Sequence, residues 1–222
     1  MLTYQNILFD LDGTLTDPFE GLANSVQYSL KKMGLQEPDR TSIRRFIGPP
    51  LIHSYMEFYG LSRTDAERAV AYYREFYTVK GLYQNRVYPG MESLLSALKQ
   101  ADARLFVATS KPQGFAEEVL RHFGLTPYFE HIEGVAIDNC EVEKDVLMQT
   151  VLQKFLLDKK ETAMVGDRKY DIQSANKVGI CSIGILHGYG SRAEFEACGA
   201  KVIVKDSYAL KDYLWKGDML HA

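Results

Sequence analysis

The segment that runs from Ile7 to Thr14 near the amino terminus constrains the fold of this chain most. It is a short apolar run that ends in two acids, and side chains alternate between the faces of a strand, so Asp10 and Asp12 project to one side. A cation relieves the repulsion between two such carboxylates, and oxygen ligands suit Mg²⁺. Gly13 and Thr14 permit a sharp turn that offers N–H groups to an anion. The segment therefore predicts a metal and phosphate site, with a plain turn after a strand as the alternative.

Short apolar, β-branched runs alternate with helix-like segments along most of the chain. We predict strands at Asn6–Phe9, Arg104–Ala108, His131–Val135, Thr162–Val165, Cys181–Ile185 and Lys201–Val204. Their near-continuous hydrophobicity is typical of strands that are covered on both faces. Apolar residues at helical spacing predict helices at Met91–Lys99, Phe115–Phe123, Lys144–Phe155 and Ile172–Val178. The pattern indicates an α/β fold, with a Rossmann-like parallel sheet and helices on both of its faces.

One region, from about residue 17 to residue 84, indicates helices and no strand. Asp17 is suited to cap a helix that has Pro18 in its first turn and ends at Gly34. Thr64, with Glu67 three residues later, predicts a second helix start. We expect residues 17–85 to form a small all-helical cap domain, inserted into an α/β core made of residues 1–16 and 86–222.

The charge and the cysteines exclude several classes of protein. A formal net charge of -3 argues against a basic surface that binds nucleic acid. The apolar runs are far shorter than the ~20 residues of a membrane span, and residues 1–15 do not resemble a signal peptide. Cys140, Cys181 and Cys198 form no Cys-x-x-Cys pair, so we predict free thiols. We expect a cytoplasmic monomer or homodimer without nucleic-acid or membrane partners.

The full opening segment, with both of its acids, resembles the first motif of the haloacid dehalogenase superfamily in its phosphatase branch. That family places three further motifs in a fixed order along the chain. Leu105–Pro112 fits a strand that ends in Thr109, and Met164–Asp171 fits a strand followed by Gly-Asp and a second acid. Lys144 is the candidate for the third motif by order and spacing, although several such enzymes have Lys-Pro where this chain has Lys144-Asp145.

The resemblance implies a role for each of these residues. Asp10 would attack phosphorus and form an aspartyl-phosphate, while Asp12 would protonate the leaving oxygen and then deprotonate water. Mg²⁺ would be held by the Asp10 carboxylate, the Asp12 carbonyl oxygen and the Asp167 carboxylate. Asp171 would orient this group or bind the metal through water, and it would alternatively cap a helix near Ile172. Lys144 would add positive charge beside Asp10.

Further residues are predicted to bind the phosphate or the leaving group. Thr109 would donate its hydroxyl to a phosphoryl oxygen, and Ser110, Gly13 and Thr14 would complete the phosphate site. Lys111 would face the phosphate, or it would be an exposed charge. Arg45, in the cap, would bind an anionic substrate, or it would be an exposed helix charge.

The overall pattern is similar to phosphoglycolate phosphatase-like and 5′-nucleotidase-like members with a helical cap after the first motif. It implies a Mg²⁺-dependent phosphatase that acts on a small phosphorylated metabolite, such as phosphoglycolate or a nucleoside monophosphate. The alternatives are a phosphosugar mutase with the same core and cap, and a non-catalytic binding domain on this fold. A dehalogenase is disfavoured because it lacks an acid at the position of Asp12.

Overall fold

The structure is a computed structural model that describes residues 2–36, 39–139 and 142–216. It divides into two compact units, which take in Met1–Thr16 with Val87–Ala222, and Asp17–Arg86. Two short strands, β2 (Thr16–Asp17) and β3 (Arg86–Val87), lie where the chain passes between the units and pair with each other.

The first unit contains a parallel sheet of six strands in the order β5-β4-β1-β6-β7-β8. The strands are β1 (Asn6–Phe9), β4 (Arg104–Pro112), β5 (His131–Val135), β6 (Thr162–Gly166), β7 (Cys181–Ile185) and β8 (Val202–Val204). In the register of the central strands, Leu8 lies between Phe106 and Met164, and all three are fully buried. The predicted α/β fold with a parallel sheet is confirmed.

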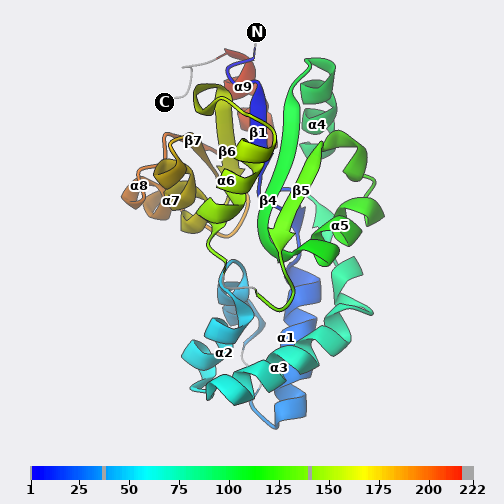
Figure 1. The fold of residues 1–222 in the computed structure, drawn as a ribbon. Helices are drawn as coiled ribbons and strands as arrows, with labels where there is room; N and C mark the ends of the chain where they lie inside the picture. The colour runs from blue at the N-terminus through cyan, green and yellow to red at the C-terminus, as the bar shows by residue number, and fades with distance from the viewer. Residues whose placement is uncertain (1, 37–38, 140–141, 217–222) are drawn as a thin grey trace. The chain divides into compact units, whose positions relative to one another are not determined.

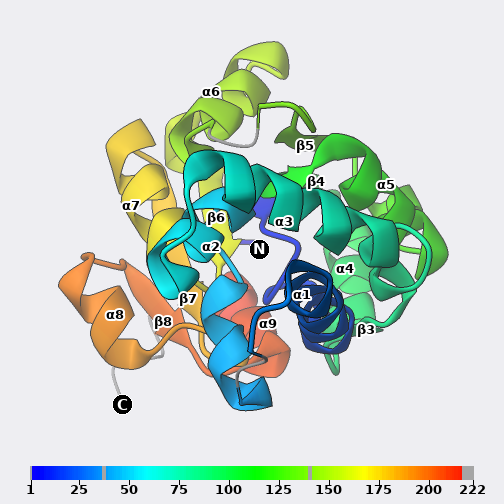
Figure 2. The ribbon, with the colours of Figure 1, turned by 90° about the horizontal axis from the view of Figure 1, so that it is seen from below.

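Helices cover both faces of this sheet. They are α4 (Met91–Gln100), α5 (Gln113–His122), α6 (Lys144–Lys154), α7 (Lys169–Val178), α8 (Arg192–Ala197) and α9 (Ser207–Lys216). Figure 1 shows α6 in front of the central strands, and the view in Figure 2 shows α6 and α7 on one side of the sheet with α4 and α9 on the other. A core cluster that includes Leu8, Met148 and Ala175 fills the space between β1, α6 and α7.

The second unit is built around two helices of fifteen residues each, α1 (Phe19–Met33) and α3 (Arg63–Tyr77). The shorter elements are α2 (Leu51–Tyr59) and the 3₁₀ helices η1 (Arg40–Phe46) and η2 (Gly81–Tyr83). The α1 helix ends at Gly34, whose φ of 67° is left-handed, as the sequence predicts. The buried faces of α1 and α3 pack together, so this unit has a helical core of its own.

Two helix starts in this unit differ from the prediction. The α1 cap is Pro18 rather than Asp17, although an oxygen of Asp17 still accepts the Phe19 N–H at 3.2 Å. The α3 cap is Ser62, two residues before the predicted Thr64, and its hydroxyl oxygen accepts the Asp65 N–H at 3.1 Å. The observed caps therefore lie one residue after Asp17 and two residues before Thr64.

Two further expectations concern the membrane and the thiols. Within the described ranges, none of the helices is both long enough and apolar enough to cross a membrane. Cys181 and Cys198 are free and half-buried, as predicted, whereas Cys140 lies outside the described residues.

Candidate active site

The candidate site lies at the carboxyl ends of three neighbouring strands at the centre of the sheet. Within the sheet, β4 and β5 lie on one side of β1, and β6, β7 and β8 lie on the other. Asp10 directly follows β1, Asp167 directly follows β6, and Thr109 lies near the end of β4. In open α/β sheets, ligands bind where strand order reverses in this way. The topology therefore brings together residues that are about 150 positions apart in sequence.

The carboxylate of Asp10 is held by two donors. Its Oδ1 accepts the Leu11 N–H at 2.7 Å, and its Oδ2 lies 2.7 Å from Nζ of Lys144. The Asp10 N–H donates to the carbonyl of Val165 at 3.0 Å, which ties the backbone to β6. The side chain is buried except for a small exposed fraction of 12%. Asp10 is therefore a fixed anion that is still open to a small ligand.

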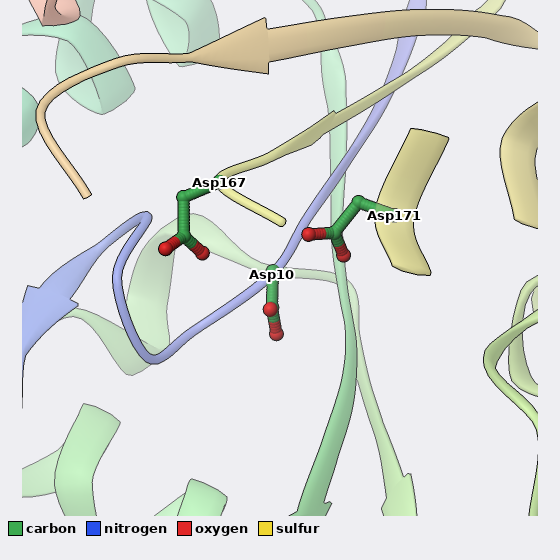
Figure 3. Close-up of side chains that lie close together, drawn as sticks. All are labelled: Asp10, Asp167 and Asp171. Atoms are coloured by element: carbon green, nitrogen blue, oxygen red, sulfur yellow. The ribbon is translucent and has the colours of Figure 1, made fainter. Parts of the chain in front are cut away.

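Three buried carboxylates meet at this point, from Asp10, Asp167 and Asp171. One ligand oxygen of each lies within 4.8 Å of the others. Figure 3 shows Asp167 and Asp171 on either side of Asp10, each reaching the cluster from a different part of the chain. Asp167 accepts the Tyr189 N–H at 2.8 Å and the Thr14 hydroxyl at 3.3 Å, so donors from two loops orient it.

Lys144 is the cation of this cluster. It is the first residue of α6, and its ammonium lies 2.7 Å from Asp10 and 2.5 Å from Asp171. Burial alone would lower the pKa of the Lys144 ammonium, but the charges of the two carboxylates outweigh burial and raise that pKa. The third motif, which the sequence supports only by order and spacing, thus supplies a charged lysine that bridges two acids.

The pKa values of Asp167 and Asp171 are raised as well, which for an acid disfavours the charged form. Burial, with the charges of Asp171 and Asp10, raises the pKa of Asp167 well above its usual range. Burial also raises the pKa of Asp171 to about 6, although Lys144 opposes the shift. Ionising all three acids next to each other is therefore unfavourable unless more positive charge is present.

Asp171 also belongs to a helix terminus. The α7 helix begins at Lys169 rather than near Ile172, so Asp171 lies inside its first turn. The Arg168 N–H donates to Oδ2 of Asp171 at 2.9 Å. The predicted capping role therefore holds in a corrected position, together with the ion pair to Lys144.

Glycines pack the acidic cluster tightly. A Cβ atom on Gly166 would overlap the Asp171 side chain, and one on Gly188 would overlap Asp167 and the carbonyl of Gly13. Gly13 has a φ of 89°, which disfavours any side chain. The close backbone approach that these glycines allow is what brings the loops of Asp10, Asp167 and residues 186–190 together.

The turn after Asp12 is closed by its own hydrogen bonds. The Gly13 N–H donates to the carbonyl of Thr16 at 2.7 Å, and the Thr14 N–H donates to that of Leu11 at 3.3 Å. The prediction that these two N–H groups face a phosphate finds no support in this arrangement. The observed role of Thr14 is instead its hydroxyl contact with Asp167.

The end of β4 carries the three residues predicted to bind phosphate. Thr109 is buried, Ser110 is half-buried, and the Lys111 N–H donates to the Thr109 hydroxyl oxygen at 3.3 Å. The Lys111 ammonium lies 2.6 Å from Oδ2 of Asp12, and its side chain is only 7% exposed. Lys111 is therefore not the exposed charge of the alternative interpretation, and its contact is with an acid of the first motif.

Arg45 lies in the second unit, at the end of η1. It is exposed, and its guanidinium lies 3.9 Å from the ring centroid of Phe58. This geometry is a cation–π contact within that unit. A role of Arg45 in binding substrate stays a prediction.

The donor set of the cluster fits a divalent metal of the magnesium type. It consists of carboxylate oxygens alone, the ligands that Mg²⁺ prefers. Three carboxylates and one ammonium leave two formal negative charges when all the acids are ionised, which a divalent ion matches. Asp10, Asp167 and Asp171 are the residues that would hold it.

The sequence did not single out two parts of the site. Tyr189 contributes its backbone N–H, which no side-chain pattern reveals. His187 contacts the carbonyl of Thr14 through Nε2 at 3.0 Å and stacks on Tyr88, with ring centroids 3.9 Å apart. The one available signal was the Gly188-Tyr189-Gly190 segment, whose glycines permit close packing against Asp167.

Comparison with known proteins agrees with the resemblance seen in the sequence motifs. The family model of haloacid dehalogenase-like hydrolases matches residues 7–185. A 5′-nucleotidase of Pseudomonas aeruginosa is 43% identical over 213 residues, which cover 96% of each chain. The tyrosine-protein kinase PtkA of Mycobacterium tuberculosis is 38% identical over 192 residues, which cover 86% of this chain and 65% of PtkA.

Two further comparisons, one with a curated protein and one with a solved structure, agree. A phosphoglycolate phosphatase of Rhodospirillum rubrum is 29% identical over 218 residues, which cover 94% of this chain and 90% of that protein. The crystal structure of a predicted phosphatase from Clostridium acetobutylicum superimposes with a TM-score of 0.89 and 41% identity, and the match covers 94% of this chain and 97% of the other.

Proposed function

The chain belongs to the haloacid dehalogenase-like hydrolases, and from this membership we propose that it is a Mg²⁺-dependent phosphatase that cleaves a small phosphate monoester through an aspartyl-phosphate at Asp10. One observation carries the proposal. Asp10 forms a buried cluster with Asp167 and Asp171, and the ammonium of Lys144 bridges Asp10 and Asp171. Such a site suits a metal and an anionic substrate together.

Asp10 is the proposed nucleophile. The Leu11 N–H and the Lys144 ammonium hold its two oxygens, so the carboxylate requires little reorganisation before it attacks. One of its oxygens forms a bond to phosphorus while the bond from phosphorus to the ester oxygen breaks. The covalent intermediate divides one difficult displacement into two easier ones.

Asp12 is the proposed acid and base. It lies two residues after Asp10 at the same strand end, and its side chain is 23% exposed. In its protonated form it would give its proton to the departing ester oxygen. As a carboxylate it would then take a proton from the water that attacks phosphorus, which releases phosphate and restores Asp10.

The metal would be held by Asp10, Asp167 and Asp171 in this proposal. When bound, Mg²⁺ would neutralise part of the negative charge that the nucleophile and the phosphoryl oxygens share. The Tyr189 N–H and the Thr14 hydroxyl support Asp167 in a fixed orientation for that purpose. Thr109, buried near the end of β4, is the proposed hydroxyl donor to the phosphate.

For the substrate, we propose a nucleoside monophosphate or a phosphoglycolate-like monoester. The support is the similarity to a 5′-nucleotidase at 43% identity and to a phosphoglycolate phosphatase at 29%. A small phosphorylated metabolite, a cytoplasmic compartment and a monomer or homodimer all stay predictions.

The test is a turnover assay of phosphorylated metabolites with the Asp10→Asn variant as the key comparison. We expect wild-type protein with Mg²⁺ to hydrolyse at least one monoester, and Asp10→Asn to lose at least about 10³-fold of that rate while it keeps its fold. Asp102→Asn is the matched control, because Asp102 is exposed and asparagine tolerates its positive φ of 59°. Substantial turnover by Asp10→Asn would refute the nucleophile.

Two other phosphoryl-transfer activities are distinguished in the same assay. A phosphosugar mutase would isomerise a hexose phosphate and would depend on a bisphosphate activator. A protein kinase activity, which the similarity to PtkA raises, would transfer phosphate from ATP to a tyrosine and would release no free phosphate. Release of phosphate from a monoester, in the absence of a bisphosphate activator and of ATP, supports the phosphatase.

A further inference from the structure

The contact between Lys111 and Asp12 joins the second sequence motif to the first. Nζ of Lys111 lies 2.6 Å from Oδ2 of Asp12, and the lysine side chain is 7% exposed. A lysine with this little exposure loses most of its hydration, so its ion pair is stronger than one at the surface. The pair is also selective, because it engages one of the two oxygens of the carboxylate.

The backbone around Lys111 is shaped to place this side chain. Between Ala108 and Pro112, β4 advances by four residues while β5 advances by two. Irregularities of this kind change the direction of side chains at the end of a strand. The Lys111 N–H donates to the Thr109 hydroxyl oxygen, so the same segment fixes both residues.

The neighbouring strand secures the segment from the other side. A Cβ atom on Gly134 of β5 would lie 2.7 Å from the carbonyl oxygen of Lys111, so only glycine allows this approach. The Gly134 N–H in turn donates to the side chain of Gln113 at 2.6 Å. Lys111 therefore extends from a rigid part of the sheet rather than from a loose loop.

The other oxygen of Asp12 is in the opposite situation. Among the described residues, Oδ1 of Asp12 is buried and accepts no hydrogen bond. A buried carboxylate oxygen without a donor is costly, and the cost is removed when a ligand supplies one. The leaving oxygen in its protonated form and the attacking water are donors of that kind.

We propose that Lys111 is a positioning residue that acts through Asp12: it holds Oδ2, and thereby presents Oδ1 as the atom that exchanges the proton with the leaving group and with water. This proposal rests on the proposed phosphatase function and assigns Lys111 a part in it. It differs from the sequence-based prediction, in which Lys111 contacts the phosphate itself. A phosphate ligand would act independently of Asp12, whereas a positioning residue would not.

The test is a double-mutant cycle of Lys111→Met and Asp12→Asn, measured as kcat and KM for phenyl phosphate and p-nitrophenyl phosphate. Methionine keeps the length of the buried stem and removes the charge. We expect Lys111→Met to lower kcat by about 10–100-fold, as loss of a supporting contact does elsewhere, with KM changed less than about 3-fold. In the Asp12→Asn background the same change should cost less than about 2-fold.

The two substrates and two further variants test whether the effect of Lys111 depends on proton transfer and on its positive charge. Phenolate is the poorer leaving group and depends more on a proton, so Lys111→Met should lower kcat more for phenyl phosphate than for p-nitrophenyl phosphate. Lys111→Arg should restore most of the rate. Lys99→Met, at an exposed lysine of α4, should leave both constants unchanged.

The outcomes separate this proposal from the function on which it rests. If Lys111→Met raises KM, or costs the same factor with and without Asp12, Lys111 is a phosphate ligand and the positioning role is wrong. If Lys111→Met shows a wild-type melting curve and wild-type kinetics, the role is also wrong. Absence of turnover by the wild-type protein on any monoester would instead overturn the proposed function, and the positioning role with it.

Discussion

Gly13 faces the carboxylate of Asp167 with no space between them for a side chain. A Cβ atom on Gly13 would overlap both oxygens of that carboxylate, and the φ of Gly13 is 89°. Two separate constraints, one steric and one conformational, therefore require glycine at this position. The turn after Asp10 and the loop after β6 are therefore in direct contact at Gly13 and Asp167, so a shift of one displaces the other.

The Gly13→Ala variant should lose both stability and activity. A left-handed φ costs an alanine about 1–2 kcal/mol, and displacement of Asp167 adds to that cost. We expect the free energy of unfolding to fall by more than about 1 kcal/mol and kcat to fall at least about 10-fold, measured by chemical denaturation and by phosphatase assay.

The matched control for this variant is Gly114→Ala. Gly114 lies in α5, and a Cβ atom there would meet nothing within 4 Å. Alanine should therefore stabilise the helix slightly, by up to about 1 kcal/mol, and leave kcat unchanged. Equal effects of the two substitutions would contradict a specific role for Gly13.

Lys144→Met should be the most disruptive conservative change in the site. The substitution leaves the buried carboxylates of Asp10 and Asp171 without their shared cation. Loss of one partner of a buried ion pair costs about 3–5 kcal/mol, and the charge beside the nucleophile is lost as well. We expect a lower melting temperature without Mg²⁺ and a fall in kcat of at least about 10²-fold with it.

Lys177→Met is the comparison for this prediction. Lys177 also pairs with two acids, Glu143 and Asp145, but its side chain is 59% exposed. Solvent screens exposed pairs, so stability and turnover should change little. If Lys144→Met behaves like Lys177→Met, the ammonium of Lys144 has no special part in the site.

The sequence predicts those parts of the site that recur as short motifs at strand ends. Asp10, Asp12 and Asp167 follow apolar runs, and the parallel topology then brings them together without further information. Lys144 is different, since a single lysine has no pattern of its own. It could be assigned only because its order after the second motif matched the resemblance, and the structure places its ammonium between Asp10 and Asp171.

Other features lie beyond sequence reasoning for physical reasons. Tyr189 contributes a backbone N–H, which every residue other than proline has, so its identity carries no signal. The direction of Lys111 depends on an irregularity in β4 pairing, which appears only when two strands are aligned. The cap of α3 at Ser62 was missed because Ser62 and Thr64 have similar capping preferences, and Pro18 was missed because it precedes α1 without a side-chain cap bond.

Binding of Mg²⁺ should weaken as the pH falls through about 6. Burial raises the pKa of Asp171 to about 6 and raises that of Asp167 as well, so both acids bind protons in a range where unfolded acids do not. For the metal-free protein, this term favours the folded state at low pH and is lost as the pH rises through about 6. Metal and protons compete for the same oxygens, so the metal reverses this trend.

The measurement is the melting temperature with and without Mg²⁺ at about pH 5 and about pH 7.5. We expect a larger rise on adding Mg²⁺ at the higher pH, and a smaller difference between the two pH values in Asp171→Asn. Chelation of the metal should abolish turnover in the wild-type protein. A rise that is the same at both pH values, or full activity in excess chelator, would contradict the metal assignment.

His187→Ala should weaken the site by loosening the surroundings of Asp167. His187 joins the carbonyl of Thr14 to the loop that carries Tyr189, and its ring stacks on Tyr88. Removal of the imidazole frees the Thr14 carbonyl and that loop, so Asp167 loses part of its support from both sides. We expect about a 10-fold higher Mg²⁺ concentration for half-maximal activity, because loss of supporting contacts costs about 10–100-fold in metal affinity.

The control for His187→Ala is His122→Ala, at an exposed histidine of α5 that also contacts an aromatic ring. It should leave the Mg²⁺ requirement unchanged. A saturating Mg²⁺ concentration should restore most of the activity of His187→Ala, since the three carboxylates of the cluster are all retained. If activity stays low at saturating Mg²⁺ while the melting curve is normal, His187 acts on the chemical step rather than on the support of Asp167.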